Sequence, residues 1–96
     1  MNETFASVWD ALEDDPLQAE ELKLRSEIIA TLCSWVRVNK LTQVEAAALL
    51  KVTQPRISDL MRGKITVFGM DALTKMLLIT GARLKVCTAP VTAFAN

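Results

Sequence analysis

The amino-acid sequence predicts an all-α domain, a bundle of about five helices that ends in one C-terminal β-strand. Apolar residues recur at helical spacing up to about Gly81, and Pro16 and Gly63 stand where helices begin and end. Over residues 82–88 the pattern changes to the two-residue alternation of a strand. Ninety-six residues supply one hydrophobic core, which must be aliphatic because aromatic residues make up only 5% of the chain.

A long helix is predicted from about Leu17 to near Asn39. It follows Asp15-Pro16, where an earlier helical segment must stop because the residue before proline avoids the α region. Its apolar positions form one stripe that is expected to face the core, and a tryptophan in such a stripe is expected to pack there. The stripe comprises Leu24, Ile28, Leu32, Trp35 and Val36.

Two short helices joined by a tight turn are predicted next. Thr42 caps the first of them, TQVEAAALL, and Glu45 three residues later completes a capping box. Ala46 to Ala48 keep this helix narrow, so that another helix can cross it closely. Leu49 and Leu50 are expected to face the core.

The second short helix lies within TQPRISDLMRGK, residues 53–64. Thr53 is the expected N-cap, Pro55 falls in the first turn where its missing N–H costs little, and Gly63 ends the helix. Ile57 and Leu60 are the inward positions. The polar residues are therefore directed outward, namely Gln54, Arg56, Ser58, Asp59 and Arg62.

The last predicted elements are a helix from about Gly69 to Thr80 and the strand over 82–88. A single strand in an otherwise helical chain has no partner within that chain, although its edges need hydrogen bonds. We therefore expect it to pair with a second copy in a homodimer, with Leu84 and Val86 as the dimerisation residues.

Charge is distributed unevenly along a chain whose net charge is zero. Residues 1–27 hold eight acids and two bases, whereas residues 28–96 hold nine bases and three acids. Neutralising phosphates requires a local basic surface and not a positive total, so the balance is compatible with nucleic-acid binding. The predicted organisation is an acidic arm over 1–16, a helical domain over 17–81 with its central motif at 42–64, and a dimerisation strand and tail over 82–96.

Several classes of function are disfavoured by composition. The chain has no histidine, which removes Ser-His and Cys-His nucleophiles and most zinc ligand sets. Cys33 and Cys87 are far apart and are expected to be buried structural thiols. We expect no enzyme activity, no cofactor and no metal, and, because no leader or membrane-length apolar run is present, a cytoplasmic protein that does not enter membranes.

The outward residues of the central motif suit the edges of DNA bases. Gln54 can bond adenine N6 and N7 in a bidentate manner, and Arg56 can do the same with guanine O6 and N7. Two roles are possible for Asp59. Its carboxylate can accept a hydrogen bond from cytosine N4, or it can pair with Arg56 or Arg62 and hold them in place. These three residues are the candidate base readers.

Other residues of the motif suit the phosphate backbone. Thr53 and Ser58 carry hydroxyls that can donate to phosphate oxygens, and Arg62 and Lys64 follow the far end of the helix. Gln43, the first residue of the preceding helix, is expected to lie where that helix crosses the backbone.

The segment from Thr42 to Lys64 resembles the helix-turn-helix of Xre/Cro-type repressors, which often read TQ-x-x-A-x-x-L-G-V-TQ-x-x-I-S-x-x-x-x-G. F-x-SVWDAL, ELKLRSE and F-x-x-DAL-x-x-ML extend the likeness, over about residues 5–87, to the branch that includes HigA-like antitoxins. The resemblance implies a lambda-repressor-like bundle that binds double-stranded DNA. Two departures are Lys51, where glycine is usual, and Gly69, where serine usually caps a helix.

Two compatible functions are expected from these features. One is a dimeric repressor of an inverted-repeat operator, and the other is neutralisation of a RelE/HigB-like ribonuclease toxin. Phe5, Trp9 and Leu12 in the acidic arm are the candidate toxin-binding residues, unless they pack back on the domain. The alternative is a stand-alone Xre-family regulator with no toxin partner.

Overall fold

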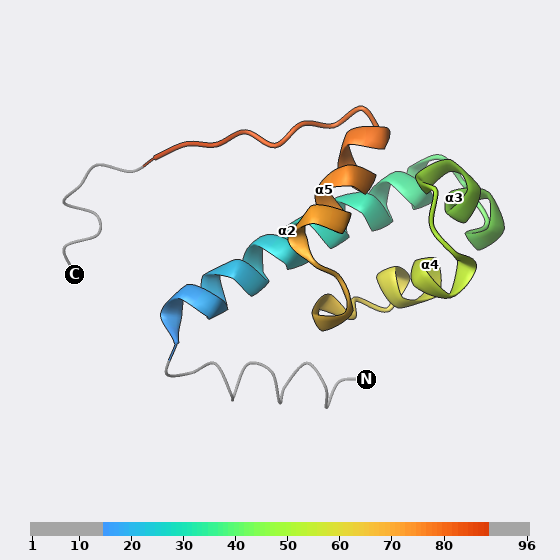
Figure 1. Cartoon of the computed structure of the whole chain (residues 1–96). Coiled ribbons are helices and arrows are strands. Elements are labelled where there is room, and N and C mark those ends of the chain that lie inside the picture. Colours follow the sequence, from blue (N-terminus) through green and yellow to red (C-terminus); the bar gives the residue numbers. More distant parts are fainter. Residues whose placement is uncertain (1–14, 89–96) are drawn as a thin grey trace.

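The computed structural model describes residues 15–88, which form four α-helices and one 3-10 turn. Helix α5 crosses the middle of the long helix α2, and the two short helices α3 and α4 lie together beyond one side of that crossing (Figure 1). The all-α prediction is confirmed for these residues, while the helical segment expected around Phe5, Trp9 and Leu12 lies outside them. The elements are α2 (Pro16–Val38), α3 (Gln43–Leu50), α4 (Gln54–Met61), η1 (Ile65–Val67) and α5 (Met70–Ile79).

Helix α2 begins and ends at residues whose side chains satisfy its terminal backbone groups. The Asp15 carboxylate accepts from the Gln18 amide at 3.2 Å, and Pro16 occupies the first turn, where an N–H is not needed. At the other end, the Asn39 side-chain amide donates to the Trp35 carbonyl at 2.8 Å. The bounds therefore agree with the predicted helix to within one residue.

The predicted apolar stripe of α2 was wrong at one position. Leu24 is 50% exposed. The face of α2 that packs on the core instead includes Leu22 and Ile29, which are both buried. At about 100° per residue, Leu24 lies about 120° around the helix from the buried Val36, which places it beside the core-facing stripe rather than on it. Trp35 is half-buried and packs against the edge of the core.

Helix α3 carries the capping box that the sequence predicted. The Glu45 amide donates to Thr42 Oγ1 at 3.1 Å, and the Thr42 amide donates to Glu45 Oε1 at 2.8 Å. Leu50 is buried as expected, but Leu49 is 50% exposed, so the prediction that both leucines face the core was wrong for Leu49. Leu49 lies about 100° around the helix from Leu50, outside the face on which Ala46, Ala47 and Leu50 are buried.

The turn between α3 and α4 is built on a lysine in the left-handed region. Lys51 has φ 60° and ψ 42°, and the Val52 amide closes the helix end by donating to the Ala47 carbonyl at 3.0 Å. This backbone position is the one where glycine was expected, because a side chain there costs roughly 1–2 kcal/mol. Lys40 has φ 54° and adopts the same region between α2 and α3, a conformation that the sequence pattern did not predict.

The core is aliphatic and is shared by all four helices. Its most deeply buried large side chains are under 2% exposed and come from each helix in turn: Leu32, Leu50, Ile57, Leu60 and Leu73. Phe68, which follows η1, is the single aromatic side chain buried among the described residues. The Cys33 thiol, on α2, donates to the Leu60 carbonyl of α4 at 3.4 Å, and its burial raises its pKa, an effect that Arg37 partly opposes.

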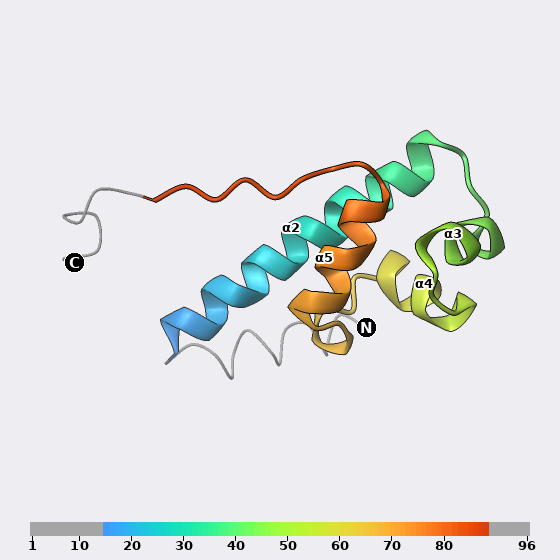
Figure 2. The same cartoon turned by 45° about the horizontal axis from the view of Figure 1, so that its top comes forward.

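No strand forms within residues 15–88 of the single chain, and the C-terminal strand that was expected to pair with a second copy stays a prediction. After Gly81, which has φ 91°, residues 82–88 leave α5 as an extended segment pointing away from α3 and α4 (Figures 1 and 2). A strand requires a neighbouring backbone for its hydrogen bonds, and no described segment runs beside this one. Cys87 is exposed, contrary to the expectation that both cysteines are buried.

Candidate nucleic-acid interface

Helix α4 is divided sharply into a buried face and a polar face. Ile57 and Leu60 are fully buried and fix the helix to the rest of the bundle, whereas Gln54 and Arg56 at its start are exposed. The core contact therefore determines which side of α4 meets solvent. A helix held in this way, with polar groups at its N-terminal end, has the form of a helix that enters the DNA major groove.

Thr53 occupies the N-cap position of α4 but does not cap the helix with its side chain. Its backbone has the extended conformation expected of an N-cap, with φ −78° and ψ 158°, and its hydroxyl makes no cap hydrogen bond. Pro55 lies in the first turn, as predicted. The Thr53 hydroxyl is consequently not committed to the helix, which leaves it available to an oxygen of a ligand.

Arg56 is held against the segment that follows α4. Its Nη1 donates to the Val67 carbonyl at 3.5 Å, and its Cζ lies 5.7 Å from the centroid of the Phe68 ring. The side chain nevertheless belongs to an exposed residue, so the guanidinium remains at the surface. No local sequence pattern predicts this contact, because Val67 follows Arg56 by eleven positions.

Asp59 pairs with a residue that was not among its expected partners. Its Oδ1 lies 3.6 Å from Lys64 Nζ, and the structure shows no ion pair between Asp59 and Arg56 or Arg62. Gly63, with φ 71°, turns the chain at the end of α4 and brings Lys64 back beside the helix. Lys64, an expected phosphate contact, therefore has a carboxylate neighbour in the DNA-free chain.

The predicted DNA-contacting residues all lie on α3, on α4, in the turn that joins these helices or in the loop that follows α4, and α3 packs against α4. Five are exposed and three are half-buried. The exposed ones are Gln43, Thr53, Gln54, Arg56 and Arg62, and the half-buried ones are Ser58, Asp59 and Lys64.

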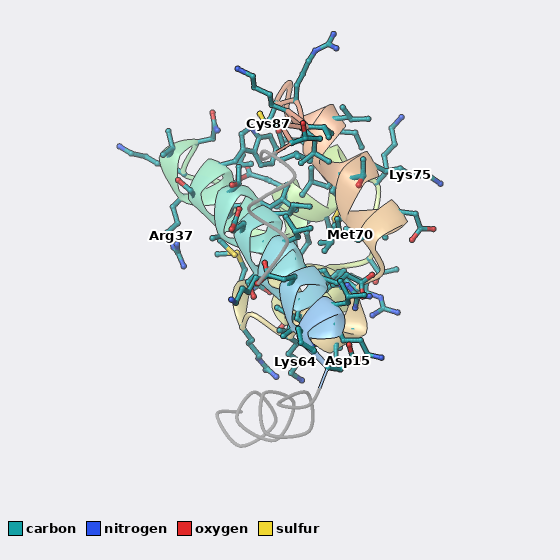
Figure 3. The ribbon with its side chains drawn as sticks, turned by 90° about the vertical axis from the view of Figure 1, so that its left-hand side faces the viewer. Asp15, Arg37, Lys64, Met70, Lys75 and Cys87 are labelled. Atoms are coloured by element: carbon teal, nitrogen blue, oxygen red, sulfur yellow. The ribbon has the colours of Figure 1, made fainter. Side chains whose placement is uncertain are left out.

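Two basic residues outside the predicted set also lie close to this region. Lys51 is exposed in the turn that joins α3 to α4. Arg37, on α2, lines a hollow of about 370 Å³ together with Arg62 and Gly63 at the end of α4, and it extends away from the bundle (Figure 3). Lys51 could have been found from its place in the turn. The position of Arg37 depends on how α2 packs on α4, which the sequence pattern does not specify.

Two short helices joined by the turn at residues 51–53, with the second presenting a polar N-terminal end, define a DNA-binding helix-turn-helix domain. In agreement, residues 11–88 match the family described as a helix-turn-helix domain, and the chain belongs to that family. No curated protein matches the chain. Membership makes this a DNA-binding protein of the transcriptional-regulator class, and the family is typically not enzymatic. No helix in the described part is long and apolar enough to cross a membrane.

Proposed function

We propose that the chain is a sequence-specific repressor that inserts the N-terminal end of α4 into the DNA major groove. The observation that carries this proposal is the orientation of α4, whose buried Ile57 and Leu60 hold Gln54 and Arg56 at the surface. In this role Gln54 reads adenine, Arg56 reads guanine and Asp59 lies near a neighbouring base edge. Phosphate contacts are assigned to Gln43, Thr53, Ser58, Arg62 and Lys64.

The repressor is proposed to act as a homodimer on an inverted repeat. Apolar side chains stay exposed at the end of α5 and beyond it, with Leu78 at 56%, Leu84 at 47% and Val86 at 89%. Lys64 and Cys87 lie at opposite ends of the molecule as viewed in Figure 3, so pairing through residues 82–88 leaves the α4 surface uncovered. Two such domains would place their recognition helices about 34 Å apart, one turn of DNA.

Two single substitutions test the assignment of base and phosphate contacts. A preferred duplex is first selected from a random library, and affinities for it and for a random duplex are measured at two salt concentrations. Arg56→Ala should cost about 1–3 kcal/mol on the selected duplex and much less on the random one. Lys64→Ala should weaken both equally and reduce the salt slope by about one. Equal losses on both duplexes for Arg56→Ala would refute the base-reading role.

A second proposed activity is neutralisation of a basic ribonuclease toxin, as in the antitoxins of type II pairs. A specific observation favours it: on the outer face of α2, Leu17 is 83% exposed and Leu24 is 50% exposed. Exposed acids share that face, namely Glu20, Glu21 and Glu27. Glu20 and Glu21 pair with Lys23 and Arg25 of the same helix, and Glu27 forms no ion pair among the described residues. A ribonuclease is basic where it holds RNA, so an acidic face with apolar anchors is complementary to it.

The competing interpretation is a stand-alone regulator with no toxin partner. The test is co-expression with the protein encoded by the neighbouring reading frame, followed by growth measurements and co-purification. Leu17→Ser together with Leu24→Ser should relieve inhibition while DNA binding is retained. Val38→Ser, at a 75% exposed apolar residue at the other end of α2, is the matched control. A neighbouring protein that is neither toxic nor bound would favour the stand-alone regulator.

A further inference from the structure

The recognition helix makes one unusual contact with the rest of the protein. Arg56, three residues after the N-cap of α4, reaches a residue that follows α4 and η1 in the sequence, with its Cζ 5.7 Å from the Phe68 ring centroid. Its Nη1 also donates to the Val67 carbonyl at 3.5 Å. Two groups of one short segment therefore hold the Arg56 guanidinium. The Phe68 ring makes a cation–π contact with it, and the Val67 carbonyl accepts a hydrogen bond from it.

The segment that holds Arg56 is itself fixed in the core. Ile65 and Phe68 are each only 4% exposed, although they lie in the loop between α4 and α5. Helix α2 packs against η1 and so also holds the loop in place. Because the Phe68 ring is packed in the core, its position is fixed, and it can support a side chain at the surface.

We infer that Phe68 is a positioning residue that holds the Arg56 guanidinium ready to read a base. This inference rests on the proposed function of Arg56. A bidentate contact with guanine requires the planar fork of arginine to lie in the plane of the base, and a long side chain loses rotamer freedom when it is fixed there. The Phe68 ring and the Val67 carbonyl restrict the rotamers of Arg56 before DNA binds. Less conformational entropy is therefore lost when Arg56 binds guanine in the correct sequence.

The test separates the aromatic ring from the apolar volume. Phe68→Leu keeps a buried hydrocarbon side chain but removes the π face on which the guanidinium rests. Binding is measured to the duplex selected from a random library and to a random duplex, and the specificity ratio is the quotient of the two affinities. A cation–π contact at an exposed site is worth enough to lower that ratio about two- to fivefold. Affinity for the random duplex should not change.

Ile65→Val is the matched control, since it trims an equally buried side chain of the same segment that offers Arg56 neither a ring nor a hydrogen-bond acceptor. Urea unfolding of both variants shows whether lost stability accounts for any loss of binding. A fall in the ratio for Ile65→Val equal to that for Phe68→Leu would overturn the inference, because general loosening of the loop would then explain both.

A double-mutant cycle supplies the decisive readout. In the Arg56→Ala background, Phe68→Leu should cause no further loss of the specificity ratio, because the side chain that it positions is gone. A loss that persists in that background would overturn the positioning role, and so would an unchanged ratio for Phe68→Leu alone. If Arg56→Ala itself leaves the ratio unchanged, the proposed base-reading function fails first and the inference falls with it.

Discussion

The left-handed turn between α3 and α4 predicts how substitutions of Lys51 change the free energy of unfolding, in both direction and magnitude. Lys51, at φ 60° and ψ 42°, stores roughly 1–2 kcal/mol of backbone strain that glycine does not experience. Glycine is more flexible than alanine in the unfolded chain, and this lowers the free energy of unfolding by about 0.5–1 kcal/mol. We therefore expect Lys51→Gly to be more stable than Lys51→Ala by about 1 kcal/mol, or about 4–8 °C in Tm for a domain of this size.

Comparing glycine with alanine at residue 51 cancels the loss of the lysine charge, which is common to both variants. Urea and thermal unfolding supply the free energies. Ala48→Gly, at an exposed position inside α3, is the control of opposite sign and should cost about 0.5–1 kcal/mol. If Lys51→Gly were no more stable than Lys51→Ala, the argument that this turn is strained would be refuted.

Three further predictions concern capping, charge and thiol chemistry. Thr42→Ala should cost about 1 kcal/mol of unfolding free energy by losing its capping box, whereas Thr53→Ala, which loses no cap hydrogen bond, should cost much less. Asp59→Asn should strengthen binding to random DNA in a titration, because it removes an anion and releases its lysine partner; unchanged or weaker binding would contradict this. A thiol reagent should label Cys87 and spare Cys33 in the folded chain. Because burial raises the pKa of Cys33, an unfolded chain loses that proton first, so stability should fall as pH rises above the ordinary thiol range, and a Cys33→Ala variant should lack that fall.

Much of the helix pattern could be predicted because its signals are local. The capping box at Thr42, Pro55 in the first turn of α4 and Gly63 at its end each act within a few residues of themselves. The buried pair Ile57 and Leu60 follows from helical periodicity in the same way. The outward-facing polar positions of α4 then follow by geometry.

Errors arose where burial depends on a neighbour rather than on the helix itself. Leu24 and Leu49 are apolar and helical, but neither faces another element of the bundle, and each remains 50% exposed. Residues 82–88 form no strand within the described single chain, because a strand needs a second backbone beside it, and the expected pairing with a second copy stays a prediction. Asp59 was expected either to accept from cytosine or to pair with Arg56 or Arg62. The structure pairs it with Lys64 instead of an arginine, because the turn at Gly63 determines which cation returns to it, and the contact with cytosine stays a prediction.

The sequence by itself determined the helices, the turn that joins α3 to α4 and the residue types offered to DNA, because caps, breakers and periodicity operate within one or two helical turns. Only the tertiary structure decided that Arg56 rests on Phe68, that Asp59 meets Lys64 and that Arg37 and Arg62 line one hollow. Those contacts join residues that are distant in sequence or separated by a turn. Their geometry is set by how α2, α4 and η1 pack around one aliphatic core, which no local pattern encodes.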